Sequence, residues 1–257
     1  MNTPTRQDYR DVDCLSVNPS THPICQLKYD GIWCCAIANK LEIEYYSRNG
    51  QCKRIDKNLA KVEPGIYIGE LMFGSEWAQH PDRKDKFYCF DMIQLGNDSY
   101  RDFPYEYRYL KLVYLFNSGC YNPGWVLIIN YPTTEKEKIW SKAVDTLHFE
   151  GIVFRNPLDP WAVTLLRAKH EIEEDLIIVG YERGKGRLSN TLGSLICTRP
   201  NETQEITIGG GLTDETRKTI WANFDRYVGK TITVSAKKKF ASGLLRHPNF
   251  KSFHYDK

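Results

Sequence analysis

Short runs of alternating apolar and polar residues dominate the chain and predict a protein built mainly of β-strands. The clearest run covers residues 32–48, where IWCCAIA and LEIEYYS flank a turn at Asn39–Lys40. Apolar residues at helical spacing predict helices over 105–116 and over 134–148, the second with Thr134 as its N-cap. Further strands are expected over residues 65–74, 86–93, 124–131, 149–155 and 161–170. This mixture of strands and helices is typical of an α+β fold with antiparallel-rich sheets.

The pattern changes after residue 173. Short strands such as DLIIVGYERGKGR, GSLICT, QEITIG and KTITVSAKK follow, separated by Gly-rich turns and by one helical segment over 213–224. About five short strands with one helix favour a small closed barrel such as an OB-fold. We therefore expect two domains, residues 1–173 and residues 174–257.

Positive charge is concentrated in the second of these segments. The whole chain has a formal charge of +3, whereas residues 174–257 hold 14 Lys or Arg against 9 Asp or Glu. Such a basic module suits a polyanionic partner. No apolar run is long enough for a transmembrane helix, and the first residues lack the apolar segment of a signal peptide, so we expect no membrane partner and a cytoplasmic location. If a phage encodes the chain, that location is the host cytoplasm.

The cysteines predict neither a disulfide framework nor a zinc site. The chain has eight, at positions 14, 25, 34, 35, 52, 89, 120 and 197. None forms a CxxC pair, and no Cys/His group has the spacing of zinc ligands. We expect free thiols, with Cys34 and Cys35 on opposite faces of one strand.

A lysine in CQLKYDGIWCCAI, residues 25–37, is the first candidate for chemistry. Lys28 lies among apolar and aromatic residues, where an isolated charge costs several kcal/mol, so such a group is usually paired or used. Other polar or aromatic candidates lie in or at the ends of later apolar strands: Arg48, Glu70, Phe90, Glu150, Arg167 and Lys169.

These segments, in this order, resemble the motifs of the covalent nucleotidyltransferase superfamily, which comprises ATP-dependent DNA ligases, RNA ligases and mRNA capping enzymes. LKYDGIWC is similar to the nucleophile motif KxDG, followed by SRNG, FYCFDMI, EGIVFR and LLRAKH, and GLLRHPNFKSFHYDK is similar to the last motif of the family. The match is to the small ATP-dependent DNA ligases of phages, viruses and bacteria. It implies a nucleotidyltransferase (adenylation) domain followed by a C-terminal β-barrel OB-fold domain.

The resemblance also implies a chemistry and its residues. Lys28 is then the nucleophile that forms a lysyl-AMP intermediate with ATP, and Mg²⁺, or alternatively Mn²⁺, is the metal cofactor. Glu150 and Glu70 become its metal-ligand candidates, and the ring of Phe90 becomes the platform on which adenine stacks. The implied nucleotide-binding residues are Gln26, Arg48, Glu70, Phe90, Glu150, Arg167, Lys169, His254 and Lys257.

The implied partner is nicked duplex DNA, bound by a monomeric enzyme that seals 5′-phosphate/3′-OH nicks. Clustered bases in the second domain suit the phosphate backbone. The candidates are Arg183, Lys185, Arg187, Lys237, Lys238, Lys239 and Arg246.

Two departures from the family pattern leave alternatives open. Trp33 stands where the resemblance implies an arginine, and His254 stands where it implies another. Only 27 residues precede Lys28, which disfavours NAD as the adenylate donor because NAD-dependent ligases carry an additional N-terminal module. The alternatives are an RNA ligase, a GTP-dependent mRNA capping nucleotidyltransferase, and a catalytically degenerate nucleic-acid-binding module.

Overall fold

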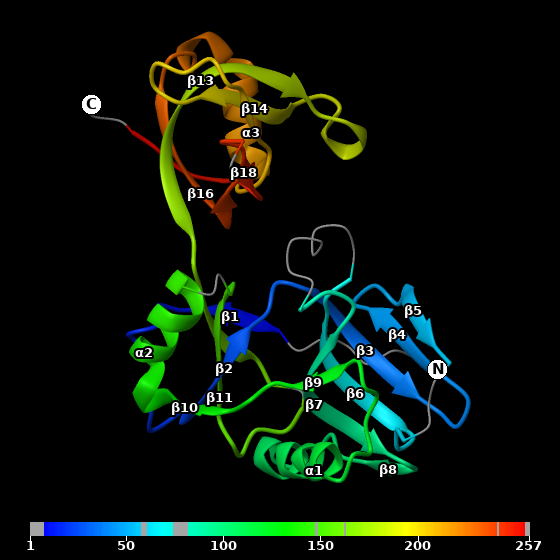
Figure 1. The fold of residues 1–257 in the computed structure, drawn as a ribbon. Helices are drawn as coiled ribbons and strands as arrows, with labels where there is room; N and C mark the ends of the chain where they lie inside the picture. Colours follow the sequence, from blue (N-terminus) through cyan, green and yellow to red (C-terminus); the bar gives the residue numbers. More distant parts are fainter. Residues whose placement is uncertain are drawn as a thin grey trace. The chain divides into compact units, whose positions relative to one another are not determined.

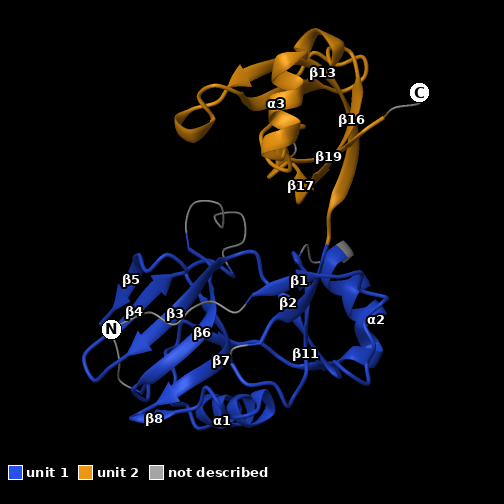
Figure 2. Cartoon of the chain, turned by 180° about the vertical axis from the view of Figure 1, so that it is seen from behind, with its two compact units in different colours: residues 1–169 blue, residues 170–257 orange. Residues whose placement is uncertain are grey.

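A computed structural model describes residues 8–57, 61–73, 82–146, 149–161, 163–240 and 242–254. The chain divides into two compact units, residues 1–169 and residues 170–257 (Figure 2). The sequence places a domain boundary after residue 173, and each unit is described by itself below.

The first unit contains two sheets and helices on their outer faces (Figure 1). The smaller sheet has the order β1-β12-β11-β2-β10. Its strands are β1 (Tyr9–Asp11), β2 (Ile24–Lys28), β10 (Tyr131–Pro132), β11 (Gly151–Arg155) and β12 (Leu165–Lys169). Within this sheet, β1 and β12 pair in parallel and the other described strands pair antiparallel. Strand β1 therefore lies beside residues more than 150 positions later in the chain.

The larger sheet has the order β5-β4-β3-β6-β7-β8, with β9 pairing in parallel with β7. Its strands are β3 (Ile32–Ala38), β4 (Ile43–Ser47), β5 (Cys52–Asp56), β6 (Gly65–Leu71), β7 (Phe87–Leu95), β8 (Asp98–Ser99) and β9 (Trp125–Leu127). The alternating run over 32–48 therefore forms the predicted hairpin. Cys34 and Cys35 are both buried, in the apolar clusters on the two opposite faces of this sheet, as the alternation predicts.

Helices cover one face of each sheet. Helix α1 (Tyr105–Asn117) follows Pro104 and buries Arg108, Leu112 and Leu115 against the larger sheet, in agreement with the helical spacing of its sequence. Ile139 of helix α2 (Lys136–Trp140) packs with the apolar side chains on one face of the smaller sheet. That packing leaves the other face of the smaller sheet for polar side chains.

Three boundaries differ from the sequence prediction. The helix expected over 134–148 is a 3₁₀ turn (Thr133–Glu135), helix α2 and a π-helical segment (Ser141–Thr146), and Thr134 caps none of them. The strand expected over 124–131 is interrupted between β9 and β10, and β12 begins only at Leu165. Apolar content alone does not place these breaks, since a short apolar run has no clear period.

The second unit is a curved antiparallel sheet with the order β15-β14-β13-β16-β19. Its elements are β13 (Ile172–Arg183), β14 (Leu192–Thr198), β15 (Ile206–Ile208), α3 (Asp214–Ala222), β16 (Thr231–Ala236), β17 (Lys238–Lys239), β18 (Leu245–Arg246) and β19 (Asn249–Phe253), with 3₁₀ turns over Gly186–Leu188 and Phe224–Arg226. A bridge between Gly210 and Asn249 joins the two ends of the sheet. The apolar core lies inside this curve and includes Ile220 of α3.

Helix α3 begins where its sequence indicates. The side chain of Thr213 accepts a hydrogen bond from the backbone amide of Thr216 at 3.1 Å, and Asp214 and Glu215 follow in the first turn. Both features stabilise a helix N-terminus. Among the residues that the structure describes, no helix is long and apolar enough to cross a membrane.

Candidate active site

The strand register gathers the candidate residues on one face of the smaller sheet. Gln26 lies opposite Val153, which lies opposite Arg167, which lies opposite Asp11. Lys28, Gly151 and Lys169 form the next row. Because side chains alternate along each strand, the positions next to these rows face the other way. They hold Cys25, Ile152, Phe154, Leu166 and Ala168, which are buried in the apolar cluster with Ile139 of α2, and Leu27, which packs against that cluster.

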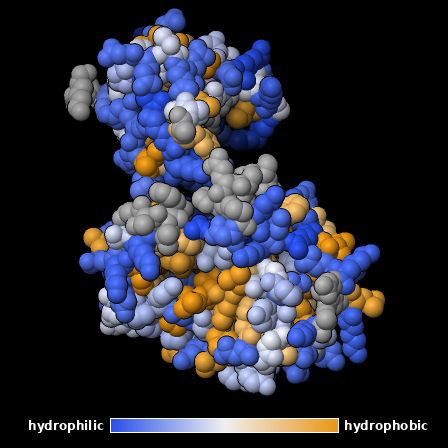
Figure 3. Space-filling model, viewed as in Figure 1, coloured by the Kyte–Doolittle hydropathy of each residue, from blue (hydrophilic) through white to orange (hydrophobic). Residues whose placement is uncertain are grey.

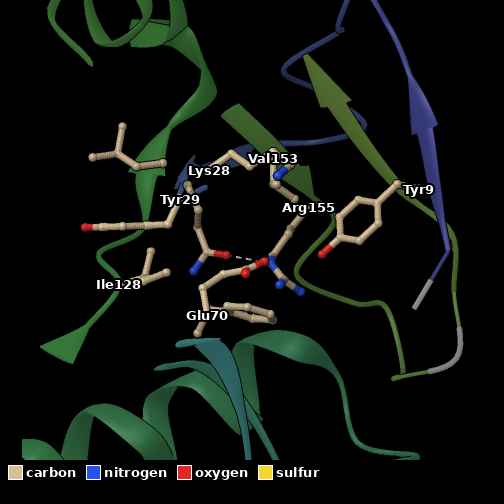
Figure 4. Close-up of a pocket in the computed structure, with 10 residues that line it drawn as sticks. Tyr9, Lys28, Tyr29, Glu70, Ile128, Val153 and Arg155 are labelled. Carbon is tan, nitrogen blue, oxygen red and sulfur yellow. Dashed lines mark hydrogen bonds between the residues drawn. The ribbon is translucent and has the colours of Figure 1, made fainter. Parts of the chain in front are cut away.

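A cavity lies between this face and the larger sheet (Figure 4). Glu70 of β6 and Phe90 of β7 line it from the larger sheet, while Arg155 and Tyr9 line it from the smaller one. Its full lining is Tyr9, Gln26, Leu27, Lys28, Tyr29, Glu70, Phe90, Ile128, Val153 and Arg155. Four predicted site residues, Gln26, Lys28, Glu70 and Phe90, therefore meet at one cavity.

Lys28 forms an ion pair with Glu150. Its Nζ donates to Glu150 Oε2, and the backbone amide of Glu150 donates to the carbonyl oxygen of Lys28 at 3.0 Å. The two side chains are only 10% and 8% exposed. A side chain at Gly151 would overlap the carbonyl oxygen of Ala168 on β12. The glycine after Glu150 therefore allows β11 to lie this close to β12. The carboxylate is thereby held directly at the lysine amine.

Gln26 is oriented by a buried network. Arg155 Nε donates to Gln26 Oε1 at 2.7 Å, and Gln26 Nε2 donates to the Tyr105 hydroxyl at 2.9 Å. Asp91 lies 3.8 Å from Arg155 Nη1 and accepts two hydrogen bonds from Arg108, at 2.9 and 2.8 Å. The charges in this network are paired, which a buried position requires.

Arg167 and Lys169 share one carboxylate. Asp11 accepts a hydrogen bond from Arg167 Nε at 2.5 Å and another from Lys169 Nζ at 3.2 Å. Burial raises the pKa of Asp11, but the hydrogen bonds from both cations outweigh burial and hold the pKa below its usual value. Asp11 is 61% exposed, so an incoming anion has access to this cluster.

Aromatic rings pack next to Lys28. Tyr29 stacks on Tyr88 with ring centroids 4.1 Å apart and meets the edge of Phe149 at 4.9 Å. The guanidinium of Arg83 lies 4.4 Å from the centroid of Phe149. Burial raises the pKa of Tyr29, so its hydroxyl stays neutral near physiological pH. These rings fix the chain on both sides of the ion pair, since Phe149 precedes Glu150.

Some predicted residues lie elsewhere. Arg48 is exposed in the turn after β4 and does not line the cavity. Trp33, at the position of the missing arginine, is buried in an apolar cluster with Phe90 and lies opposite Glu70 in the sheet. Its indole therefore adds apolar packing rather than charge beside the cavity.

The remaining nucleotide-binding candidates belong to the second unit. His254 Nε2 lies 2.6 Å from Thr233 Oγ1 and 3.2 Å from Asp175 Oδ1. Lys257 lies outside the described residues.

The predicted DNA-binding bases are distributed over the second unit, whose visible surface is largely hydrophilic (Figure 3). The exposed candidates are Arg183, Lys185, Arg187, Lys238 and Lys239, while Lys237 and Arg246 are partly buried. Arg187 pairs with Asp214 at 2.6 Å, and Lys239 pairs with Glu174 at 3.1 Å. Part of the basic charge is therefore already balanced by acids of the same unit.

Several residues of the site were not predicted from the sequence, among them Arg155, Tyr9 and Asp11. Arg155 ends the motif EGIVFR, and strand alternation with Gly151 and Val153 could have placed it on the cavity face. Tyr9 and Asp11 had no comparable signal, because their place depends on parallel pairing with a strand that ends at residue 169.

No group of three or more Asp, Glu, His or Cys side chains forms a metal cage among the described residues. Mg²⁺ does not need one, because it commonly takes one or two carboxylates together with water and substrate phosphates. Glu70 in the cavity lining and Glu150 beside Lys28 fit that requirement.

The fold is that of ligase domains. A solved Lig E DNA ligase, described as binding DNA with a minimal scaffold, matches with a TM-score of 0.74 and 17% identity, over 98% of this chain and 99% of that one. The ligase domain of LigD from M. tuberculosis matches with a TM-score of 0.53 and 15% identity, over 98% of this chain and 95% of that one.

Sequence comparison agrees with this class. The family model of the DNA ligase OB-like domain matches residues 183–253. A DNA ligase of Haloarcula marismortui is 26% identical over 212 residues, 70% of this chain and 37% of that protein, and one of Haemophilus influenzae is 28% identical over 124 residues, 45% of this chain and 46% of that protein. The chain thus spans less than half the length of these two relatives. Its resemblance to DNA ligases, predicted from the motifs, is confirmed.

Proposed function

We propose that the protein is an ATP-dependent DNA ligase that seals nicks through a lysyl-AMP intermediate on Lys28. The observation that supports this most is the lysine amine held by Glu150 beside a cavity lined by Gln26, Glu70 and Phe90. A poised amine next to a partly apolar cavity suits the transfer of a nucleotide to the protein. Residues 1–173 are the adenylation domain in this proposal, and residues 174–257 are the OB-fold domain.

The nucleotide occupies the cavity with its base at Gln26 and Phe90 and its α-phosphate at Lys28. Gln26 and Lys28 are two positions apart on β2, which corresponds to about 6.6 Å along a strand. That span is of the order of the distance from base to α-phosphate across a ribose. Arg167 and Lys169 lie on the same face and bind phosphate oxygens. The planar guanidinium of Arg167 can donate two parallel hydrogen bonds, whereas the ammonium of Lys169 acts as a compact charge.

The reaction proceeds in three steps. Lys28 Nζ first gives one proton of its ammonium to Glu150, which already accepts a hydrogen bond from it. The neutral amine then forms a bond to the α-phosphorus of ATP while the bond to pyrophosphate breaks, and its second proton leaves with pyrophosphate. The 5′-phosphate of the nick then takes the AMP group and the amine regains a proton. In the last step the oxygen of the 3′-OH attacks the activated 5′-phosphorus and its proton passes to solvent, while AMP leaves with the bonding electron pair.

Mg²⁺, for which Mn²⁺ is an alternative, would be held by Glu150 and Glu70 together with the phosphates. Its contribution when bound is to offset the negative charge of the triphosphate.

The second unit binds the duplex through its exposed bases in this proposal. The match to a DNA ligase OB-like domain over residues 183–253 supports the proposal, because all seven candidate bases lie within that range. Phosphate contacts of this kind weaken as salt increases. His254 and Lys257 are proposed to reach the outer phosphates of ATP during adenylation.

Covalent labelling tests the proposal. Wild-type protein incubated with α-labelled ATP and Mg²⁺ should retain label on a denaturing gel and should seal a 5′-phosphorylated DNA nick. Lys28→Ala should do neither, while Lys40→Ala, at an exposed turn, should do both. Label taken from GTP alone would indicate a capping enzyme, and sealing of RNA ends alone would indicate an RNA ligase. Absence of label from any nucleotide would favour a binding module and overturn the proposal.

A further inference from the structure

Gln26 carries an amide whose orientation is fixed before any ligand binds. Arg155 Nε can only donate a hydrogen bond, so its partner at 2.7 Å on Gln26 must be the amide oxygen. The amide nitrogen then faces the Tyr105 hydroxyl at 2.9 Å, and that hydroxyl donates onward to Asn130 Oδ1 at 2.9 Å. Reversing the amide would set its NH₂ group against Arg155, donor against donor.

Arg155 is itself firmly held. Its guanidinium lies 4.4 Å from the ring centroid of Tyr105 and 5.2 Å from that of Phe90, and Asp91 lies 3.8 Å from Nη1. Gln26 and Arg155 are each only 2% exposed. Water therefore cannot readily replace the hydrogen bond between them, which makes the orientation of the amide a property of the folded protein.

We infer that Arg155 is a specificity-determining residue, which locks the Gln26 amide in the orientation that accepts adenine and rejects guanine. This inference rests on the proposed function, in which the base lies at Gln26. After its bonds to Arg155 and Tyr105, Gln26 retains one acceptor direction on Oε1 and one N–H on Nε2. Adenine offers an N–H donor at position 6 beside a ring-nitrogen acceptor, which complements that pair.

Guanine offers the opposite pattern at the same place. Its position 6 is an oxygen acceptor, which would face the amide oxygen of Gln26. A free glutamine could turn its amide over to accommodate guanine, whereas one locked by Arg155 cannot. Arg155 is thus a positioning residue that acts through Gln26.

The wild-type protein provides the sharpest test, because it needs no variant to fold. Binding of three triphosphates would be measured by calorimetry in EDTA, so that no turnover occurs: ATP, inosine triphosphate with oxygen at position 6, and purine riboside triphosphate with hydrogen there. A locked amide predicts that ATP binds tightest and that inosine triphosphate binds more weakly than purine riboside triphosphate. Inosine triphosphate binding as tightly as the purine analogue would overturn the lock. Absence of binding by all three would overturn the proposed function with it.

Variants then assign the lock to Arg155. Arg155→Met should reduce the ratio of ATP to GTP affinity by roughly tenfold, and Arg155→Lys, which keeps a donor, should restore part of it. Tyr105→Phe is the matched control, since it removes the other partner of Gln26 but leaves the amide oxygen held, and its ratio should stay near that of wild type. Asp91 keeps both hydrogen bonds from Arg108 in all three variants, so they should fold. An unchanged ratio of ATP to GTP affinity in Arg155→Met would contradict the inference. An equally large decrease of that ratio in Tyr105→Phe would contradict it as well.

Discussion

Lys28 Nζ donates its hydrogen bond to Glu150 Oε2, and the backbone of Glu150 donates to the carbonyl oxygen of Lys28. One side-chain and one backbone hydrogen bond therefore connect Lys28, at the end of β2, with Glu150, immediately before β11. A nucleophile that must meet an α-phosphate in line benefits from such a fixed position. The nearest proton acceptor is fixed by the same contacts.

The first prediction concerns this carboxylate. Glu150→Gln keeps the shape of the side chain and a hydrogen-bond acceptor but removes the charge, so adenylation should fall by roughly 10²- to 10⁴-fold. Single-turnover labelling with ATP measures the rate. Glu137→Gln, on an exposed position of α2, should label at the wild-type rate. Equal rates in the two variants would show that Glu150 has no part in the first step.

The second prediction concerns Asp11, which occupies both cations that are proposed to hold phosphates. Asp11→Asn removes a negative charge within 3.2 Å of Arg167 and Lys169, so ATP should bind several-fold more tightly, by roughly 1 kcal/mol as for an exposed ion pair. Equilibrium titration in EDTA measures the dissociation constant. Asp13→Asn is the control, as Asp13 is exposed on the same segment and pairs with neither cation. Weaker binding in Asp11→Asn would mean instead that the carboxylate positions the cations.

The same residue predicts a pH dependence of stability. The lowered pKa of folded Asp11 means that its contribution is complete above its unfolded value, near 3.9, and is lost as pH falls through the folded value. Wild type should therefore exceed Asp11→Asn in free energy of unfolding by at most about 1 kcal/mol at neutral pH, since the Asp11 carboxylate is largely exposed. The difference should vanish in strong acid. Urea denaturation at several pH values checks this, and a difference that grows towards low pH would contradict it.

The sequence was most informative where candidate residues lie in apolar strands and in recognisable motifs. Gln26, Lys28 and Phe90 lie in such strands, and the order of the motifs predicted their common location. The helix over 105–116 was equally clear because its apolar side chains repeat with one period.

What the sequence could not provide were contacts between distant segments. Asp11 reaches Arg167 only because β1 joins β12 in parallel, and no local pattern encodes that pairing. Asp91 and Arg108 form a buried ion pair next to Arg155, yet each alone resembles an ordinary charge in a strand or helix. Arg48 shows the converse, because its motif predicted a cavity residue and the structure has it exposed in a turn.

The fourth prediction tests that buried pair. Arg108 and Asp91 have side chains that are 1% and 0% exposed, so Arg108→Met leaves a carboxylate buried without its two strongest donors. We expect a loss of about 3–5 kcal/mol in the free energy of unfolding. The double variant Asp91→Leu/Arg108→Met should lose less than Arg108→Met alone, because no unpaired charge remains. Thermal and urea unfolding measure both, and additive losses would contradict the argument.

The last prediction concerns the basic segment after β16. Lys238 and Lys239 are exposed, with Lys237 beside them, and removal of all three should weaken binding to nicked DNA and reduce its dependence on salt. The slope of log affinity against log salt concentration should decrease by less than the loss of three phosphate contacts would give, because Lys239 is already paired with Glu174 at 3.1 Å. Adenylation should be unaffected, since it needs no DNA. The charge-matched control replaces the exposed lysines 40, 57 and 138 of the first unit by alanine, and a loss of nick affinity as large in that control would show that total charge, rather than this segment, determines binding.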